Sequence, residues 1–359
     1  MKNTKNILFL AAVLIIIISI VLIGQNKSRM INNNAPVLLA GSNSDIALEK
    51  EKIYPRAREL VNPQGYIDIN TITISENIGK KVILIDFWTY SCINCQRTIP
   101  YLNSWYEKYK DKGLIIIGVH TPEFDFEKDY NNVKRAVEKF KIKYPVVQDN
   151  NFETWSAYGN QYWPRKYLID IDGFIVYDHI GEGGYDEVEM KIQELLDERN
   201  NRLKLKENIS KELAKPDITN TEFKNIGSPE IYFGYGFSRG QIGNSEGLHP
   251  DEIIDYKLPL KKENNKFYLS GKWLNNKDNM ELKSDNGFIV LNYLAKNVNL
   301  VAGSKEPAEI KVFVDNSEVN RLNVSNFDLY PVVSMNNYGK HELRIESSKG
   351  LMAYTFTFG

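Results

Sequence analysis

The sequence predicts an α/β domain with a central mixed sheet flanked by helices, followed by an all-β sandwich or jelly roll. Three observations support this fold class. The chain has 359 residues, which suits about two domains. Apolar strand-like and helix-like segments alternate over residues 51–200, whereas residues 229–359 contain short runs that alternate with period two. Residues 201–228 are charged and contain Pro216 and Gly227, which indicates a linker.

The α/β domain is predicted from its apolar periodicity. KVILIDFW (81–88) and GLIIIGVH (113–120) are continuous apolar runs, typical of strands buried on both faces. KYLIDIDGFIVYDHIG (166–181) predicts two strands joined at an Asp-Gly turn. Helical spacing of apolar residues predicts helices over 92–111, 129–143 and 185–200.

The all-β domain is predicted from six short runs: KFYLSGKW, FIVLNYLA, NVNLVAG, AEIKVFVD, HELRIESS and LMAYTFTFG. Turn residues such as Asp285-Asn286-Gly287 separate them. Strands spaced in this way indicate an antiparallel sheet structure.

The N-terminus predicts a membrane anchor. Residues 7–24 form an uncharged apolar run, near the minimum length for one transmembrane helix. No small-x-small cleavage site follows, so we expect an uncleaved signal anchor, with a cleaved signal peptide as the alternative. Residues 1–6 form a short tail before the anchor, and the polar residues 25–50 read as a tether. We expect a single-pass protein of the cytoplasmic membrane, with its bulk outside the cytoplasm.

The chain has only two cysteines, Cys92 and Cys95, and a net charge of −1. That charge and the lack of a basic patch argue against a nucleic-acid partner. A disulfide between them would close a loop of two residues and constrain little of the unfolded chain. Structural zinc needs four ligands, and the four histidines are scattered. The pair lies between a buried strand and a helix start, where the helix dipole favours a thiolate at Cys92. A redox role is therefore favoured, without metal or cofactor.

The segment DFWTYSCINCQRTIP (86–100) resembles the active site of the thioredoxin superfamily. The resemblance implies that Cys92 is the nucleophile and Cys95 the resolving thiol. Asp86 falls where the family keeps a buried carboxylate, a candidate proton acceptor for Cys95, because burial raises a carboxyl pKa. Trp163-Pro164 resembles the cis-proline loop, which makes Pro164 a substrate-aligning residue.

Further segments resemble the membrane-anchored TlpA/ResA-like branch and the extracytoplasmic part of DipZ-type proteins. These are the lead-in NPQGYIDINTITISENIGKK, the run GVHTPEF, the run WPRKYLIDIDG and the β-rich tail ending in FTFG. Two features depart from the pattern: Ser91 replaces the tryptophan of thioredoxin, and Ile93-Asn94 replaces Gly-Pro. DipZ-type proteins also carry a polytopic electron-importing domain, so we expect a separate membrane electron-transfer partner here.

Four further residues are predicted to line the groove around the sulfur atoms: Trp88, Tyr90, Trp163 and Glu123. The alternatives are core packing for Trp88 and a solvated loop carboxylate for Glu123.

The predicted function is a thiol–disulfide oxidoreductase that acts on protein disulfides or dithiols, with reduction favoured over oxidation. One alternative is a thiol-dependent peroxidase, since Thr89 lies three residues before Cys92. The other is a module whose β-rich domain binds carbohydrate or protein, with an accessory redox domain.

Overall fold

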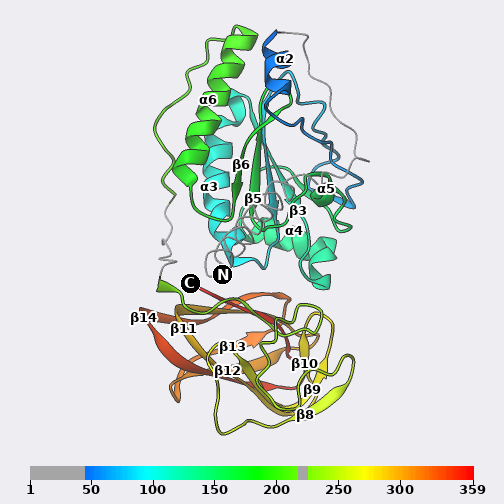
Figure 1. The fold of residues 1–359 in the computed structure, drawn as a ribbon, viewed down its shortest axis with the longest axis vertical. Coiled ribbons are helices and arrows are strands. Elements are labelled where there is room, and N and C mark those ends of the chain that lie inside the picture. Colours follow the sequence, from blue (N-terminus) through cyan, green and yellow to red (C-terminus); the bar gives the residue numbers. More distant parts are fainter. Residues whose placement is uncertain (1–44, 217–224) are drawn as a thin grey trace, which may run out of the picture.

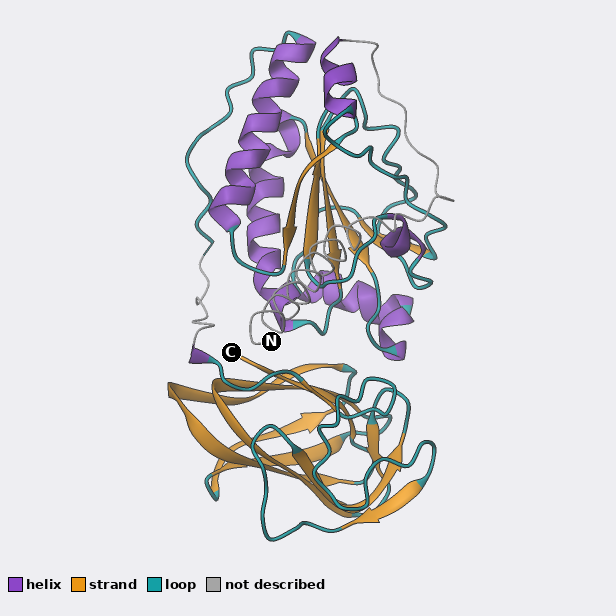
Figure 2. Ribbon diagram, in the orientation of Figure 1, coloured by secondary structure: helices purple, strands orange, loops and turns teal. Residues whose placement is uncertain are grey.

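The computed structural model describes residues 45–216 and 225–359. Figure 1 shows two domains stacked end to end, an N-terminal domain up to residue 216 and a C-terminal domain from residue 225. Helices flank the sheet of the first, whereas the second consists almost entirely of strands and loops (Figure 2). The predicted anchor 7–24 lies outside the described residues. Among the helices that are described, none is both long and apolar enough to cross a membrane.

The N-terminal domain contains a six-stranded mixed sheet in the order β1-β4-β3-β2-β5-β6. Strands β2, β3 and β4 are parallel, while β1, β5 and β6 pair antiparallel with their neighbours. The strands are β1 Gly65–Ile67, β2 Val82–Trp88, β3 Leu114–His120, β4 Val146–Gln148, β5 Arg165–Ile169 and β6 Ile175–Ile180. The two predicted central strands and the predicted hairpin are therefore confirmed.

Helices cover both faces of this sheet. Alternate residues of β2 point to opposite faces, because successive side chains of a strand alternate. One face packs against α3, α4 and α6, and the other packs against α5 and the segment before β2. The helices and 3-10 turns are α2 Asp45–Glu51, α3 Ile93–Tyr109, η1 Lys110–Lys112, η2 Asp125–Lys128, α4 Tyr130–Lys139, α5 Glu153–Ala157 and α6 Tyr185–Leu203.

The C-terminal domain is all-β, as predicted, and its strands form one continuous nine-stranded sheet around a single core. Strand β11 pairs with β9 through its first half and with β15 through its second, so the sheet folds back on itself. The strands are β7 Ile231–Tyr232, β8 Ile253–Tyr256, β9 Phe267–Asn275, β10 Met280–Leu282, β11 Asn286–Gly303, β12 Ala308–Val314, β13 Ser317–Val324, β14 Asp328–Ser348 and β15 Met352–Phe358.

Three segments differ from the sequence interpretation. The runs FIVLNYLA and NVNLVAG belong to the single strand β11, whose register shifts between Ala295 and Asn297. Helix α2 lies within the last part of the segment predicted as a tether. Helix α6 continues to Leu203, and Ile209 then packs against the N-terminal domain, so the first part of the predicted linker belongs to that domain.

Candidate active site

The two cysteines lie at the N-terminal end of helix α3. Cys92 is the N-cap residue, with extended backbone geometry, and its sulfur accepts the backbone N–H of Cys95 at 3.3 Å. Cys92 is partly exposed, whereas Cys95 is 1% exposed, and both are free thiols. Burial raises the pKa of Cys95 well above its ordinary value, and the hydrogen bond and charge of Cys92 raise it further. The arrangement gives an accessible thiol and a shielded one.

Asp86 lies beneath this pair, on strand β2. It is 1% exposed, and its Oδ1 atom has no hydrogen-bond partner among the described groups. Burial raises the pKa of Asp86 to about 7, although the positive charge of Lys166 works in the opposite direction. The negative charge of Asp86 also raises the pKa of Cys95. A carboxyl that titrates near neutrality beside a buried thiol is suited to proton transfer.

Lys166 is a site residue that the sequence interpretation missed. It pairs with Asp86 in the ladder between β5 and β2, and it is completely buried. Its ammonium group donates to the carbonyl of Gly181 at 3.2 Å. Burial lowers the pKa of Lys166, and the charges of Asp86 and both cysteines oppose that shift. A lysine inside the apolar strand KYLID was the signal in the sequence, but its partner depends on strand register.

Two other buried polar atoms lie near Asp86. Gly118 is the β3 neighbour of Asp86, and its missing side chain leaves room for Trp88 and Tyr144. A Cβ atom there would lie 3.0 Å from Trp88 Nε1 and 3.1 Å from Tyr144 Cε2. Neither Trp88 Nε1 nor the Tyr144 hydroxyl has a hydrogen-bond partner among the described groups. The surroundings of Asp86 are therefore buried, polar and incompletely hydrogen-bonded.

The peptide bond between Trp163 and Pro164 is cis, as the resemblance implied. The carbonyl of Pro164 accepts the Gly181 N–H at 2.8 Å, which holds this loop against β6. The indole of Trp163 donates to the carbonyl of Thr121 at 3.0 Å and is only partly buried. Trp163 and Cys92 pack on the same apolar cluster beside α3.

The other predicted groove residues lie elsewhere. Trp88 is completely buried, so it packs in the core and does not line an open groove. Tyr90 is 2% exposed, and its hydroxyl donates to the carbonyl of Phe327 in the C-terminal domain at 3.2 Å. Glu123 accepts a hydrogen bond from Tyr232 of the C-terminal domain at 2.8 Å. Tyr90 and Glu123 thus belong to the contact between the domains.

Glu127 was also missed, and it holds the turn before Cys92. Its Oε1 accepts the hydroxyl of Ser91 at 2.7 Å and the Ser91 backbone N–H at 3.3 Å. Thr89 is buried as well, and its hydroxyl lies 3.4 Å from His120 Nε2. Burial lowers the pKa of His120 to about 3, so this imidazole is neutral.

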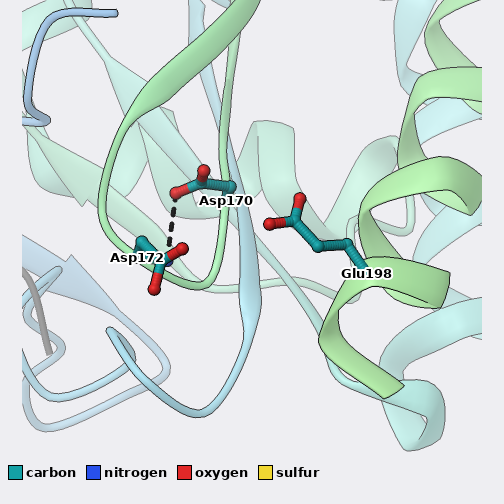
Figure 3. Close-up of side chains that lie close together, drawn as sticks. All are labelled: Asp170, Asp172 and Glu198. Atoms are coloured by element: carbon teal, nitrogen blue, oxygen red, sulfur yellow. Dashed lines mark hydrogen bonds between the residues drawn. The ribbon is translucent and has the colours of Figure 1, made fainter. Parts of the chain in front are cut away.

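One acidic cluster lies away from the cysteines. Asp170, Asp172 and Glu198 lie close together between the β5–β6 turn and α6 (Figure 3). The ammonium group of Lys50 contacts all three, at 2.6 Å from Asp170 and 3.4 Å from Asp172. Arg202 also pairs with Asp172 at 2.6 Å. Two cations therefore offset most of the charge of these three carboxyl groups, and Lys50 attaches α2 to the sheet.

Comparison with known families agrees with this architecture. Residues 57–178 match the AhpC/TSA family, and residues 228–359 match the family described as thioredoxin like C-terminal domain. The chain therefore contains a thioredoxin-like AhpC/TSA domain followed by a thioredoxin-like C-terminal domain. Its thioredoxin-like part contains the cysteine pair, Asp86 and Pro164.

Three relatives have informative names. Protein DipZ of Mycobacterium bovis is 37% identical over 285 residues, covering 79% of this chain. This chain spans about 40% of the length of DipZ. ResA of Bacillus thuringiensis is 33% identical over 114 residues, covering 32% of this chain and 63% of ResA. YkuV of Bacillus subtilis is 28% identical over 140 residues, covering 39% of this chain and 93% of YkuV. ResA and YkuV are both named thiol-disulfide oxidoreductases.

Proposed function

We propose that this protein is a membrane-anchored, extracytoplasmic thiol–disulfide oxidoreductase that exchanges electrons with protein disulfides through Cys92 and Cys95. The observation that carries the proposal is the asymmetry of the pair: a partly exposed thiol at a helix N-cap and a buried thiol three residues later. Backbone N–H groups at a helix N-terminus stabilise negative charge, and the Cys92 sulfur accepts one of them. The names of ResA and YkuV support the same reaction class.

The reaction proceeds in two exchanges. The Cys92 thiolate attacks one sulfur of a substrate disulfide, forms a mixed disulfide and releases the other sulfur as a thiolate. Cys95 then loses its proton and attacks Cys92, which releases the second substrate thiolate. The substrate gains two electrons and, after protonation, two protons, while the Cys92–Cys95 disulfide forms. The reverse sequence oxidises a dithiol.

Asp86 is proposed to accept the proton of Cys95 in the second exchange. While Cys92 is a free thiol or thiolate, its hydrogen bond and charge help to raise the pKa of Cys95. Both are lost when Cys92 enters a mixed disulfide, so Cys95 becomes more acidic when it must attack. A carboxyl with a pKa of about 7 is then a suitable acceptor near neutral pH.

Reduction of substrates is the proposed direction. It requires a reductant for the oxidised pair, and we propose a separate membrane electron-transfer partner. Residues 7–24 would hold the protein beside that partner. The resemblance to TlpA/ResA-like proteins supports this direction, and no histidine stands between the two cysteines.

Trapping of the mixed disulfide tests the proposed function. The full-length Cys95→Ser variant is mixed with a protein disulfide substrate such as insulin and analysed without reductant. We expect a covalent adduct through Cys92, since the second exchange is blocked. The Cys92→Ser variant, which keeps the shielded Cys95, is the matched control and should form none. Equal adduct formation by both variants would exclude the assigned roles.

A further inference from the structure

The two domains meet at a cluster in which the Tyr232 hydroxyl faces two carboxyl groups. It lies 2.8 Å from Glu123 Oε1 and 3.1 Å from Glu230 Oε2. A phenol has one hydrogen, so it donates fully to only one of two carboxylates. A proton on one of the carboxyls allows that group to donate in turn, so that both contacts become full hydrogen bonds.

The surroundings of Glu123 favour that protonated state. Burial and the negative charge of Glu127 raise the pKa of Glu123 to about 8, and Glu230 adds to the shift. Two groups lower that pKa only in part: Tyr232 through its hydrogen bond, and Arg239, whose guanidinium lies 4.7 Å from the centre of the Tyr232 ring, through its charge. At neutral pH Glu123 thus keeps its proton.

An apolar cluster shields this contact and reaches the cysteine motif. It buries Phe124 of the N-terminal domain with Tyr232, Met352 and Tyr354 of the C-terminal domain. Ile93, the residue after Cys92, packs against it. One of the two residues between the cysteines therefore packs against a cluster that both domains share.

A chain of hydrogen bonds runs from Glu123 to the residue before Cys92. Glu127 Oε2 accepts the backbone N–H of Glu123 at 2.6 Å and of Phe124 at 3.0 Å. Its other oxygen accepts both the hydroxyl and the N–H of Ser91. One buried carboxylate thus ties the Glu123 loop to the turn that carries the nucleophile.

We propose that Tyr232 is a positioning residue for Cys92: its hydrogen bonds to Glu123 and Glu230 dock the C-terminal domain on the loop that orients the Ser91–Cys92 turn. The proposal rests on Cys92 being the reactive thiol of the proposed function. Both hydrogen bonds form below about pH 8, where Glu123 is protonated, and one of the two is lost as the pH rises through the pKa of Glu123. The turn that carries Cys92 is then held less firmly.

The test measures alkylation of Cys92 by iodoacetamide in the full-length protein from pH 6 to 10, with the modified cysteine identified by mass spectrometry. The Glu123→Gln rate is divided by the wild-type rate at each pH, which removes the increase in rate that both proteins share as the thiol ionises. A glutamine mimics the protonated carboxyl at every pH. We expect a ratio near one below pH 7 and a change of about 3- to 10-fold above pH 8, the size expected for one lost hydrogen bond.

Tyr232→Phe is the second variant, and it should change the rate by a similar factor below about pH 7, where the wild-type contact is intact, and by less above pH 8. Tyr235→Phe is its matched control, because the Tyr235 hydroxyl contacts Asp251 on the surface. A Glu123→Gln ratio that stays constant from pH 6 to 10, or a Tyr232→Phe rate equal to that of Tyr235→Phe, would overturn the proposal. Alkylation needs no disulfide exchange, so failure of the proposed function would appear separately, as absent adducts with insulin.

Discussion

Two regions of the molecule, the surroundings of Asn275 in the C-terminal domain and those of Asp86 in the N-terminal domain, treat their buried polar groups in opposite ways. In the C-terminal domain, Asn275 is completely buried and uses its full hydrogen-bonding capacity. Its oxygen accepts from the His249 N–H at 3.1 Å and the Tyr256 hydroxyl at 2.8 Å. Its amide group donates to the carbonyls of Glu252 at 3.2 Å and Trp273 at 3.3 Å. Such a residue fixes the loops around it.

Around Asp86 in the N-terminal domain, by contrast, Asp86, Trp88 and Tyr144 each keep a buried polar atom without a partner among the described groups. Unsatisfied groups of this kind destabilise a fold and are rare. A group that must gain and lose a proton cannot be fully satisfied in both states, whereas a purely structural amide can. The unpartnered oxygen of Asp86 therefore suits a site of chemistry, and the fully bonded amide of Asn275 suits a site of folding.

The largest expected effect is on stability and comes from Asp86→Asn. The pKa of Asp86 is about 7 in the fold against 3.8 ordinarily, so between those values the folded state binds the extra proton and wild-type stability falls as pH rises. The asparagine variant does not lose stability in this way. Urea unfolding should show that its free energy of unfolding, relative to wild type, increases by up to about 4 kcal/mol from pH 4 to 7 and levels off above pH 7.

Asp255→Asn, at an exposed position of β8, is the control and should show no such trend. A stability difference for Asp86→Asn that does not vary between pH 4 and 8 would contradict the account of this carboxyl.

The next effect is expected for Asn275→Ala. Removal of this side chain leaves buried donors and acceptors unpaired, so unfolding should require about 2–3 kcal/mol less. Urea unfolding measures this, and Asn264→Ala at an exposed position serves as the control. Exchange by the Cys92–Cys95 pair should stay unchanged while the variant is folded. A loss of exchange at full stability would instead place Asn275 in the redox machinery.

Lys166→Met should shift the pH profile of disulfide reduction. The charge of Lys166 lowers the pKa of Asp86, so its removal should shift the Asp86-dependent step to higher pH by about one unit. Single-turnover reduction of a disulfide between pH 5 and 9 measures the shift. Lys272→Met changes an exposed lysine of the other domain and should leave the profile in place. An unshifted profile for Lys166→Met would remove Lys166 from the site.

The smallest effect is expected for Tyr144→Phe. Its hydroxyl is buried and has no partner in the part of the chain that the structure describes, so its removal should change the unfolding free energy by less than about 0.5 kcal/mol or stabilise the fold slightly. Tyr256→Phe is the contrasting variant, because the Tyr256 hydroxyl contacts the Gly247 carbonyl and Asn275, each at 2.8 Å. It should cost about 1–2 kcal/mol. Equal costs for both would erase the contrast between the domains.

Much of the fold follows from local patterns in the sequence. A pattern inside a single segment is enough to predict the apolar strands β2 and β3, the amphipathic helices and the Asp-Gly hairpin. The boundary between FIVLNYLA and NVNLVAG was wrong because a long strand can bend across a register shift without a turn residue.

The site was predictable only where one segment contains it. Cys92, Cys95 and Asp86 share the run 86–95, and Pro164 stands out through the resemblance. Lys166 reaches Asp86 only through the register of β5 on β2. Tyr232 meets Glu123 only because two domains dock, which no spacing in the sequence indicates.

The most direct test of the central claim is the reduction potential of the Cys92–Cys95 pair, measured by equilibration of the full-length protein with glutathione or dithiothreitol buffers. The account predicts a reversible two-electron couple near that of thioredoxin, about −270 mV. A couple near about −120 mV would make the protein a disulfide donor and contradict the proposed direction. The absence of any two-electron couple would contradict the oxidoreductase assignment itself.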